Sequence, residues 1–209
     1  MRASRLALCA LALAGVAGLS ATAHAQQPGA TKPATKPATK PAAKPAMKPP
    51  AVHAMGMPMM KDGLIANLER HRKNVLDYVA AAPDSMMGFR STPGVRTFAQ
   101  QIHHLAQAQA FILAGVFGTA PMAGIGDTTK VFTDKAALRD YVNLSYDYAA
   151  KIVRDATPAQ MMAEKPMFGM TRSGMQWVMG VEEHATWTLG QTVPYLRMNG
   201  VTPPSYLPF

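Results

Sequence analysis

Four segments of this chain carry apolar residues at every third or fourth position, which is the spacing of an amphipathic helix. They cover about residues 61–82, 97–117, 133–157 and 173–199. Nothing between them alternates as a half-buried strand does, and the connecting loops are rich in Gly, Pro and Thr. The sequence therefore predicts an all-α fold, a four-helix bundle formed by one domain over residues 61–209. The positions that this spacing turns toward a common core are Leu64, Leu68, His71, Val75, Val79, Phe98, Ile102, Leu105, Ile112, Val116, Leu138, Tyr141, Ser145, Tyr148, Ile152, Val178, Val181, Ala185, Leu189, Thr192 and Leu196.

Residues at the ends of these segments support the predicted boundaries. Thr97 with Gln100, and Ser173 with Gln176, have the spacing of a capping box, in which each side chain bonds the backbone N–H of the other residue. Pro83 follows the first segment, and proline is common just after a helix. These signals predict helices that begin after Thr97 and Ser173.

Residues 1–25 have the pattern of a secretory signal peptide. Arg2 and Arg5 precede an apolar stretch over 6–19, and small residues at 23–25 form a cleavage site. The stretch is short for a bilayer span, so we expect cleavage and no transmembrane segment afterwards. The single cysteine of the chain lies in this peptide, which leaves a mature protein without thiols and suits an oxidising compartment. We expect export, to the bacterial periplasm.

Residues 26–60 form a linker that is rich in Lys, Pro, Ala and Met. Five Lys-Pro pairs recur every four residues, and such repeats favour an extended, disordered tether over a helix. The tether and the signal peptide hold seven of the 21 basic residues, so residues 61–209 retain 14 basic against 12 acidic side chains. The net charge of +9 therefore does not indicate a specific nucleic-acid partner.

The end of this linker has two interpretations. Thioethers are soft ligands that suit Cu(I), so a cluster of Met and His in an exported chain without thiols can indicate periplasmic copper binding. The alternative is that methionine is simply tolerated in a linker. The residues concerned are Met47, His53, Met55, Met57, Met59 and Met60.

The last segment contains the run EHATWTLGQTVPYLRMNGVTPP over residues 183–204. It resembles the last helix of the DinB-like family of damage-inducible, four-helix, metal-binding proteins. In that family a histidine, a second histidine four residues later, Gly-Gln or Gly-Asn, and Tyr-Leu-Arg…Gly-Ile/Val-x-Pro-Pro form a recurrent signature. The first histidine corresponds to His184, whereas the second position is occupied by Thr188.

A second run, FRSTPGVRTFAQQIHHLAQAQAF over residues 89–111, is similar to the stretch that leads into the second helix of the same family. Counted from Arg96, the family's metal-binding histidine corresponds to His104 and not to its neighbour His103. The resemblance covers residues 61–209 and implies a DinB-like bundle.

The resemblance also implies a site for a divalent metal, zinc or nickel. In the family, one histidine of the second helix and two of the fourth converge on the ion, so His104 and His184 are the candidate ligands here. Thr188 is a weaker candidate because a neutral hydroxyl binds zinc or nickel poorly compared with imidazole. His71 is a second weaker candidate, since it lies on the apolar stripe of the first helix and can face the same cavity.

Three functions remain open at this point. The first is an exported binding or stress-associated module with a degenerate metal pocket and an unknown small-molecule ligand. The second is a metal-dependent transferase or hydrolase of the DinB-like family, which would need a third ligand beside His104 and His184. The third is copper binding by the Met/His-rich linker. The resemblance leaves a homodimer open, and the pattern identifies no catalytic residue.

Overall fold

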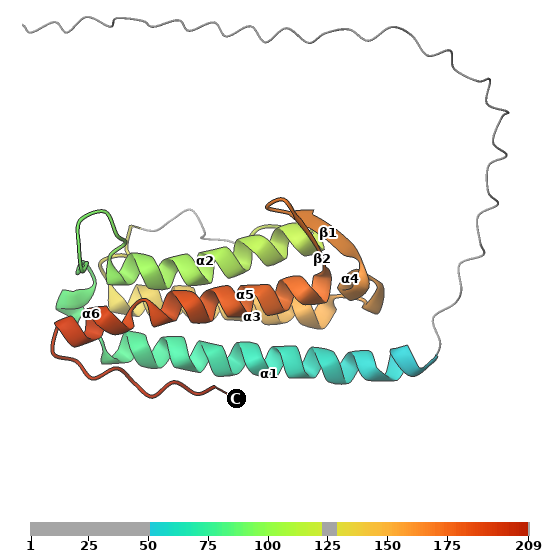
Figure 1. Ribbon diagram of the computed structural model, residues 1–209, viewed down its shortest axis with the longest axis horizontal. Helices are drawn as coiled ribbons and strands as arrows, with labels where there is room; N and C mark the ends of the chain where they lie inside the picture. The colour runs from blue at the N-terminus through green and yellow to red at the C-terminus, as the bar shows by residue number, and fades with distance from the viewer. Residues whose placement is uncertain (1–50, 123–128, 209) are drawn as a thin grey trace, which may run out of the picture. The chain divides into compact units, whose positions relative to one another are not determined.

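The computed structural model describes residues 51–122 and 129–208, with side chains from Gly56 onward. The predicted signal peptide and residues 26–50 of the predicted linker lie outside the described residues. The elements in chain order are α1 (Ala51–Ala81), η1 (Asp84–Met86), α2 (Phe98–Phe117), α3 (Lys135–Asp155), α4 (Pro158–Met162), β1 (Glu164–Met167), β2 (Met170–Ser173), α5 (Gly174–Gly190) and α6 (Val193–Met198) (Figure 1).

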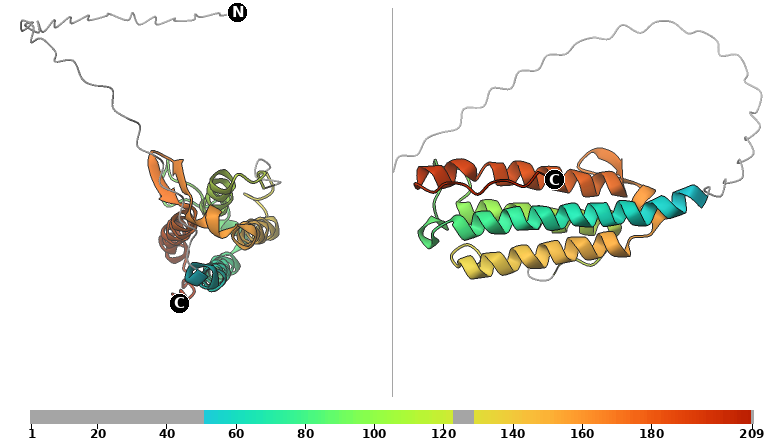
Figure 2. Two further views of the ribbon diagram at one scale, coloured as in Figure 1. Left: turned by 90° about the vertical axis from the view of Figure 1, so that its right-hand side faces the viewer. Right: turned by 90° about the horizontal axis from the view of Figure 1, so that it is seen from below.

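The long helices surround one hydrophobic core, which confirms the predicted four-helix bundle. α2 packs mainly against α3 and α5, while α1 packs against α3 and less extensively against α5. The end-on view in Figure 2 shows these helices around a common centre. Within residues 51–122 and 129–208, no helix combines the length and apolar composition that crossing a bilayer requires.

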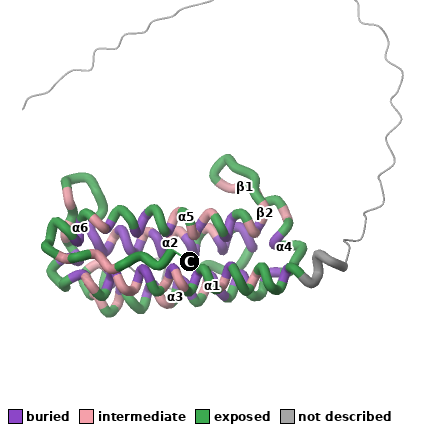
Figure 3. The backbone as a smooth tube through the Cα atoms, turned by 60° about the horizontal axis from the view of Figure 1, so that its bottom comes forward, coloured by how far each residue is buried: buried purple, intermediate pink, exposed green. Residues whose placement is uncertain are grey.

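The predicted apolar stripes face this core. Their residues are buried with two exceptions, Ile112 and Tyr148, which are half-buried and pack against the edge of the core. Figure 3 shows the same pattern along the chain, with the buried stretches on the inner faces of the helices. Burial of apolar surface contributes about 25 cal/mol per Å², so these stripes are the main source of folding free energy.

The first helix begins earlier than predicted. α1 starts at Ala51 instead of residue 61, so residues 51–60 of the predicted disordered linker are helical and include Pro58. Met57 is buried and lies two turns before Leu64, so it continues the core-facing stripe toward the N-terminus. That packing offsets the hydrogen bond that Pro58 cannot donate.

The early start of α1 also bears on the copper interpretation. Met57, one of its thioethers, packs in the core, whereas Met59 and Met60 are exposed. Met47 and the side chains of His53 and Met55 lie outside the described residues. The Met/His cluster is therefore divided between the core and the surface, and copper binding by it stays a prediction.

A short antiparallel hairpin contradicts the expectation that no strand would occur. β1 and β2 pair from Glu164↔Ser173 to Met167↔Met170. Phe168 and Gly169 form the two-residue turn, both with positive φ, at 52° and 74°. Each strand has only four residues, which is too short for alternation to be visible in the sequence.

The last predicted helix is divided in two. α5 ends at Gly190, and α6 begins at Val193 after a turn at Gln191 and Thr192. Pro194 explains the break, because proline has no N–H for the carbonyl of Gly190 and its ring would clash with that carbonyl. After α6, the chain runs back along α1 (Figure 1).

Both predicted capping boxes are present. The Thr97 hydroxyl accepts from the Gln100 N–H at 3.2 Å, and the Gln100 side chain accepts from the Thr97 N–H at 2.9 Å. Ser173 and Gln176 form the same reciprocal pair at the start of α5. These bonds satisfy backbone donors that helices leave free at their N-termini.

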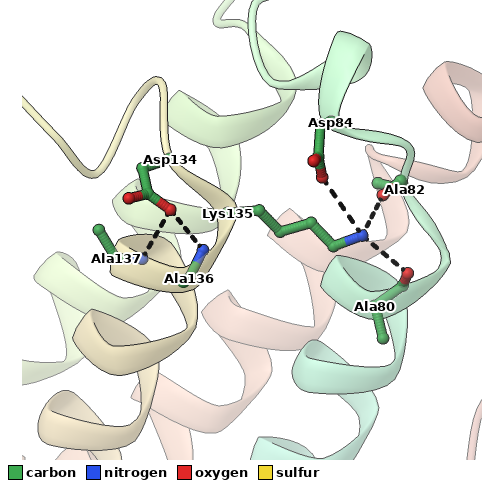
Figure 4. Close-up of polar contacts among 7 residues, drawn as sticks. All are labelled: Ala80, Ala82, Asp84, Asp134, Lys135, Ala136 and Ala137. Carbon is green, nitrogen blue, oxygen red and sulfur yellow. Dashed lines mark hydrogen bonds and ion pairs between the residues drawn. The ribbon is translucent and has the colours of Figure 1, made fainter.

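Two lysines tie the ends of α1 and α3 together. Lys135 at the start of α3 donates to the carbonyls of Ala80 and Ala82 at the end of α1, at 3.0 and 2.6 Å, and lies 3.8 Å from Asp84 (Figure 4). Lys61 of α1 donates in turn to the carbonyl of Ala156, just after α3, at 2.8 Å. Each cation thus meets the negative end of the neighbouring helix, which requires the two helices to be antiparallel.

Replacement of Lys135 by methionine is expected to lower the free energy of unfolding by roughly 1–2 kcal/mol, because carbonyls at the end of α1 lose a charged donor. Urea unfolding followed by circular dichroism measures the change. The matched control is K151M, which removes a lysine from an exposed pair with Asp155 and should change the value by less than about 0.5 kcal/mol. Equal losses in the two variants would contradict this role of Lys135.

Candidate functional site

His104 of α2 and His184 of α5 lie side by side where these helices pack. Their ring centroids are 5.2 Å apart, and the rings meet edge to face at 77°. Both side chains are half-buried, and they face the same cavity. The structure therefore brings together the two principal ligands that the sequence predicts.

Both histidines are held in the neutral form. Burial lowers the pKa of His104 to about 4, and Arg96 and His184 add to the shift. Burial also lowers the pKa of His184, with a further contribution from Arg96. Neutral imidazoles keep a lone pair that can bind a metal ion or accept a hydrogen bond. Nδ1 of His184 is buried and has no hydrogen-bond partner among the described residues.

Thr188 lies one turn after His184 and is also buried. It thus occupies a place on the helix that matches the second histidine of the family signature, but with a hydroxyl in place of an imidazole. Among the described residues, no group of three or more His, Cys, Asp or Glu side chains could hold a metal ion. The two imidazoles fit a metal as a pair of nitrogen ligands, but the residues present do not make a three-ligand centre.

Two polar residues further along the family-like run hold the site's backbone in place. The Gln191 side chain accepts a hydrogen bond from Gln101 of α2 at 2.6 Å. The Tyr195 hydroxyl donates to the carbonyl of Arg96 at 3.0 Å. The turn after α5 and helix α6 are thereby fixed to the start of α2, and the ends of both helices are kept in register beside the histidine pair.

The cavity beside the histidines has a volume of about 780 Å³ and is largely apolar in its lining. α2 and α5 form its floor, and the β1–β2 hairpin forms one wall. The lining residues are His104, Ala108, Ile112, Phe168, Met170, Arg172, Gln176, Trp177, Met179, Gly180, Val181, Glu183 and His184. A volume of this order is typical of sites for small organic molecules.

Comparison with known proteins agrees with this architecture. The sequence profile of the DinB superfamily matches residues 67–189, which is more than half of the chain. The chain belongs to the DinB superfamily. No curated protein matches the sequence significantly.

Two solved structures share the DinB fold with this chain. A DinB-like protein from Bacillus cereus superimposes with a TM-score of 0.62 at 18% identity, over 70% of this chain and 97% of that chain. A DinB-like protein from Bacillus subtilis superimposes with a TM-score of 0.52 at 16% identity, over 70% of this chain and 96% of that chain. At such identities the likeness establishes the fold alone.

The two other histidines of this DinB domain face elsewhere. His103 is buried against α3 and the loop before it, with its ring 4.6 Å from that of Tyr141 and 5.2 Å from that of Phe132. His71 is buried on α1, and its Nδ1 lies 2.5 Å from the hydroxyl of Tyr146 on α3. The structure therefore places His71 in a separate contact and not in a group of three with His104 and His184.

His71 belongs to a buried polar cluster between α1, α3 and α5. The Arg72 guanidinium lies 5.8 Å from the centre of the Tyr146 ring. Burial raises the pKa of the Glu182 carboxyl to about 7, and one of its oxygens has no partner among the described residues. Burial has the opposite effect on His71, whose pKa falls to about 4. At neutral pH His71 is therefore uncharged, whereas the Glu182 carboxyl is only partly ionised.

Sequence reasoning did not identify the residues of the cavity wall. Phe168, Met170 and Arg172 lie in the hairpin, which was expected to be a loop, and Trp177 lies in the first turns of α5. The signal available in the sequence was the pair Phe168-Gly169, since glycine is favoured in the second position of a tight hairpin turn. Strands of four residues were too short to support that reading.

The buried His71 predicts a loss of stability in acid. Its pKa is about 4 in the folded protein against an ordinary value of 6.5, so the unfolded chain binds the proton more readily. The contribution of neutral His71 to the free energy of unfolding is fully present above pH 6.5. It is lost as pH falls toward 4, by roughly 3 kcal/mol in total. His71→Gln removes this titration while keeping a polar partner for Tyr146. We expect the free energy of unfolding of the variant to fall less steeply over this range.

Urea unfolding at intervals from pH 8 to pH 4.5 measures the difference. Glu182 titrates in the opposite sense, losing stability as pH rises toward 7, but both proteins contain it and the comparison removes its contribution. Parallel curves for the two proteins would show that His71 is not the group responsible.

Proposed function

We propose that this chain is an exported small-molecule binding module whose two-histidine pocket holds a divalent metal ion only weakly. The observation that carries the proposal is the pair of neutral, adjacent imidazoles at the edge of a large cavity, with Thr188 in the place of a third imidazole. The export part rests on the signal-peptide pattern of residues 1–25.

The chemistry of the donor set supports weak metal binding. His104 and His184 would supply two nitrogen ligands, and a bound zinc or nickel ion would offer Lewis acidity and open positions. Two neutral ligands give the ion little to offset the loss of its water shell, and the Thr188 hydroxyl adds little. A metal-dependent transferase or hydrolase would need a third strong ligand, and residues 56–122 and 129–208 provide none beside the pair.

A binding role accounts for the remaining features of the site. The pocket has a well-defined volume and walls from three elements, so it can select a ligand by shape. The neutral histidines can accept or donate one hydrogen bond each to a polar group of that ligand. Stress association stays part of the proposal through the family resemblance.

Metal titration of the purified protein tests the proposal. We expect substoichiometric zinc or nickel after purification and weak binding in calorimetry. His184→Ala is expected to change the melting temperature in added zinc only slightly, because a weakly bound ion stabilises a protein little. A full equivalent of tightly held zinc or nickel that is lost in H184A would overturn the proposal in favour of a metal-dependent enzyme.

Thr188→His is the constructive test, because it restores an i, i+4 histidine pair on α5. We expect zinc affinity to rise by on the order of tenfold or more. The matched control is the double variant H184A/T188H, which has the new imidazole without its partner and should lose the gain. Thr188 is buried, so circular dichroism of the metal-free variant first establishes that it folds. If the folded variant binds zinc no more tightly, Thr188 is not the reason for weak metal binding.

A further inference from the structure

We propose that the groove beside His104 and His184 binds a planar aromatic molecule that carries an anionic group. Phe168, supported by Trp177, would form the aromatic wall of this site, and Arg172 would bind the anion. The inference deepens the proposed function by naming the class of ligand, and it rests on that function only in using the same cavity.

Phe168 adopts a backbone conformation that its side chain does not favour. It is the one residue other than glycine with positive φ among the described residues, at 52°, in a two-residue turn where Asn, Asp or Gly is preferred. Phe168 is 63% exposed, so burial does not offset the strain. The ring lines the cavity instead. A strained backbone that places an exposed aromatic ring on a cavity wall points to contact between that ring and a ligand.

Trp177 is a buried aromatic residue of the lining that holds a fixed orientation. Its indole N–H donates to the carbonyl of Lys165 in β1 at 2.9 Å, which sets the orientation of the ring. The centroids of the Trp177 and Phe168 rings are 6.4 Å apart, and the rings meet edge to face at 69°. Trp177 is buried, so it lines the cavity with little of its surface and supports the Phe168 ring, against which a planar aromatic guest can pack.

Small residues keep the floor of the groove open. Ala108 of α2 and Gly180 of α5 both line the cavity, and a Cβ added to Gly180 would meet no atom within 4 Å. The volume of about 780 Å³ therefore stays free along the seam between the two helices. The apolar floor excludes strongly hydrated ligands, since their polar groups would lose water without gaining partners.

Arg172, an exposed residue of the lining, would bind the anionic group of the ligand. Among the described residues, the Arg172 side chain makes one hydrogen bond, a long contact of 3.9 Å with the sulfur of Met170. Within residues 56–122 and 129–208, no carboxylate lies within 4 Å of its guanidinium, and Glu183 on the same lining does not pair with it. Arg96 adds positive potential at the histidine end, where it lowers the pKa of both imidazoles. A guanidinium without a carboxylate partner is suited to bind one from a ligand.

The test uses two fluorescent naphthalene probes, the anionic 8-anilinonaphthalene-1-sulfonate and its uncharged analogue N-phenyl-1-naphthylamine. The protein is treated with a chelator so that binding is measured without metal. Trp187→Phe is the working background, because Trp187 is exposed outside the lining and its removal leaves Trp177 as the reporter of the two tryptophans. We expect one probe per chain, with quenching of Trp177 as the probe binds.

Phe168→Asn separates binding from stability. Asparagine is favoured at this turn position, so the melting temperature should stay the same or rise, while affinity for both probes should fall about tenfold or more. Arg172→Gln should weaken only the anionic probe. The charge-matched control is R154Q on the exposed end of α3, which should affect neither probe.

Several outcomes would overturn the inference. They are wild-type affinity in F168N, equal effects of R172Q on the two probes, loss of affinity that follows a loss of melting temperature, and the absence of saturable binding. Size-exclusion chromatography adds one more, since a dimer that the probe dissociates would make a second copy the natural occupant of the groove. Because the probes are measured without metal, failure here leaves the zinc titrations intact, and failure of those titrations leaves probe binding intact.

Discussion

The packing of α2 against α5 is the contact on which the site depends. At one end, Gln101 bonds Gln191 and the Tyr195 hydroxyl bonds the Arg96 carbonyl. At the other end, Met167 of β1 packs so closely on Gly115 of α2 that an added Cβ would lie 2.5 Å from its terminal methyl group. The first contacts join α2 to the turn and helix after α5, the second joins α2 to the hairpin before α5, and the histidine pair and the groove lie between.

The histidine pair is partly buried and has no compensating anion that raises its pKa values. Burial and Arg96 favour neutral imidazoles in His104 and His184. Arg172 lines the groove as an exposed cation, and no carboxylate lies within 4 Å of it among the described residues. Such a site has modest attraction for a bare divalent cation and greater attraction for an organic ligand with an anionic group. This contrast is why we place binding ahead of metal catalysis for this member of the superfamily.

The region where α1 packs on α3 and α5 contains buried polar residues of its own. α1 packs less extensively on α5 than on α3, and the C-terminal segment crosses α1 with Leu207 bonded to both the amide nitrogen and the amide oxygen of the Asn74 side chain, at 3.0 and 2.9 Å. In the cluster of His71, Tyr146 and Glu182, Nε2 of His71 and one oxygen of Glu182 are buried without partners among the described residues. Unpaired buried atoms lower stability, and the lowered pKa of His71 adds a loss of stability in acid.

The core of the bundle was predictable because helix periodicity is a local property. Leu68 and Val75 could be assigned to the inner face from spacing alone, and Thr97 and Ser173 to helix starts from their capping partners. The break before α6 also had a local signal, which is Pro194. We nevertheless expected one helix there, because the resembling run of the family forms one helix. The start of α1 was missed because Lys-Pro repeats precede it and only packing of Met57 on the core extends the helix.

By itself, the sequence determined the number and the buried faces of the long helices and the superfamily. It also determined that His104 and His184 are present and that Thr188 replaces the second histidine of the family signature. Only the tertiary structure decided which polar groups meet. It set the two rings 5.2 Å apart, turned His71 to Tyr146, and placed the Phe168 hairpin over the groove. The physical reason is that helical spacing depends on neighbours a few residues away, whereas these contacts join residues far apart in the chain and depend on how whole elements pack.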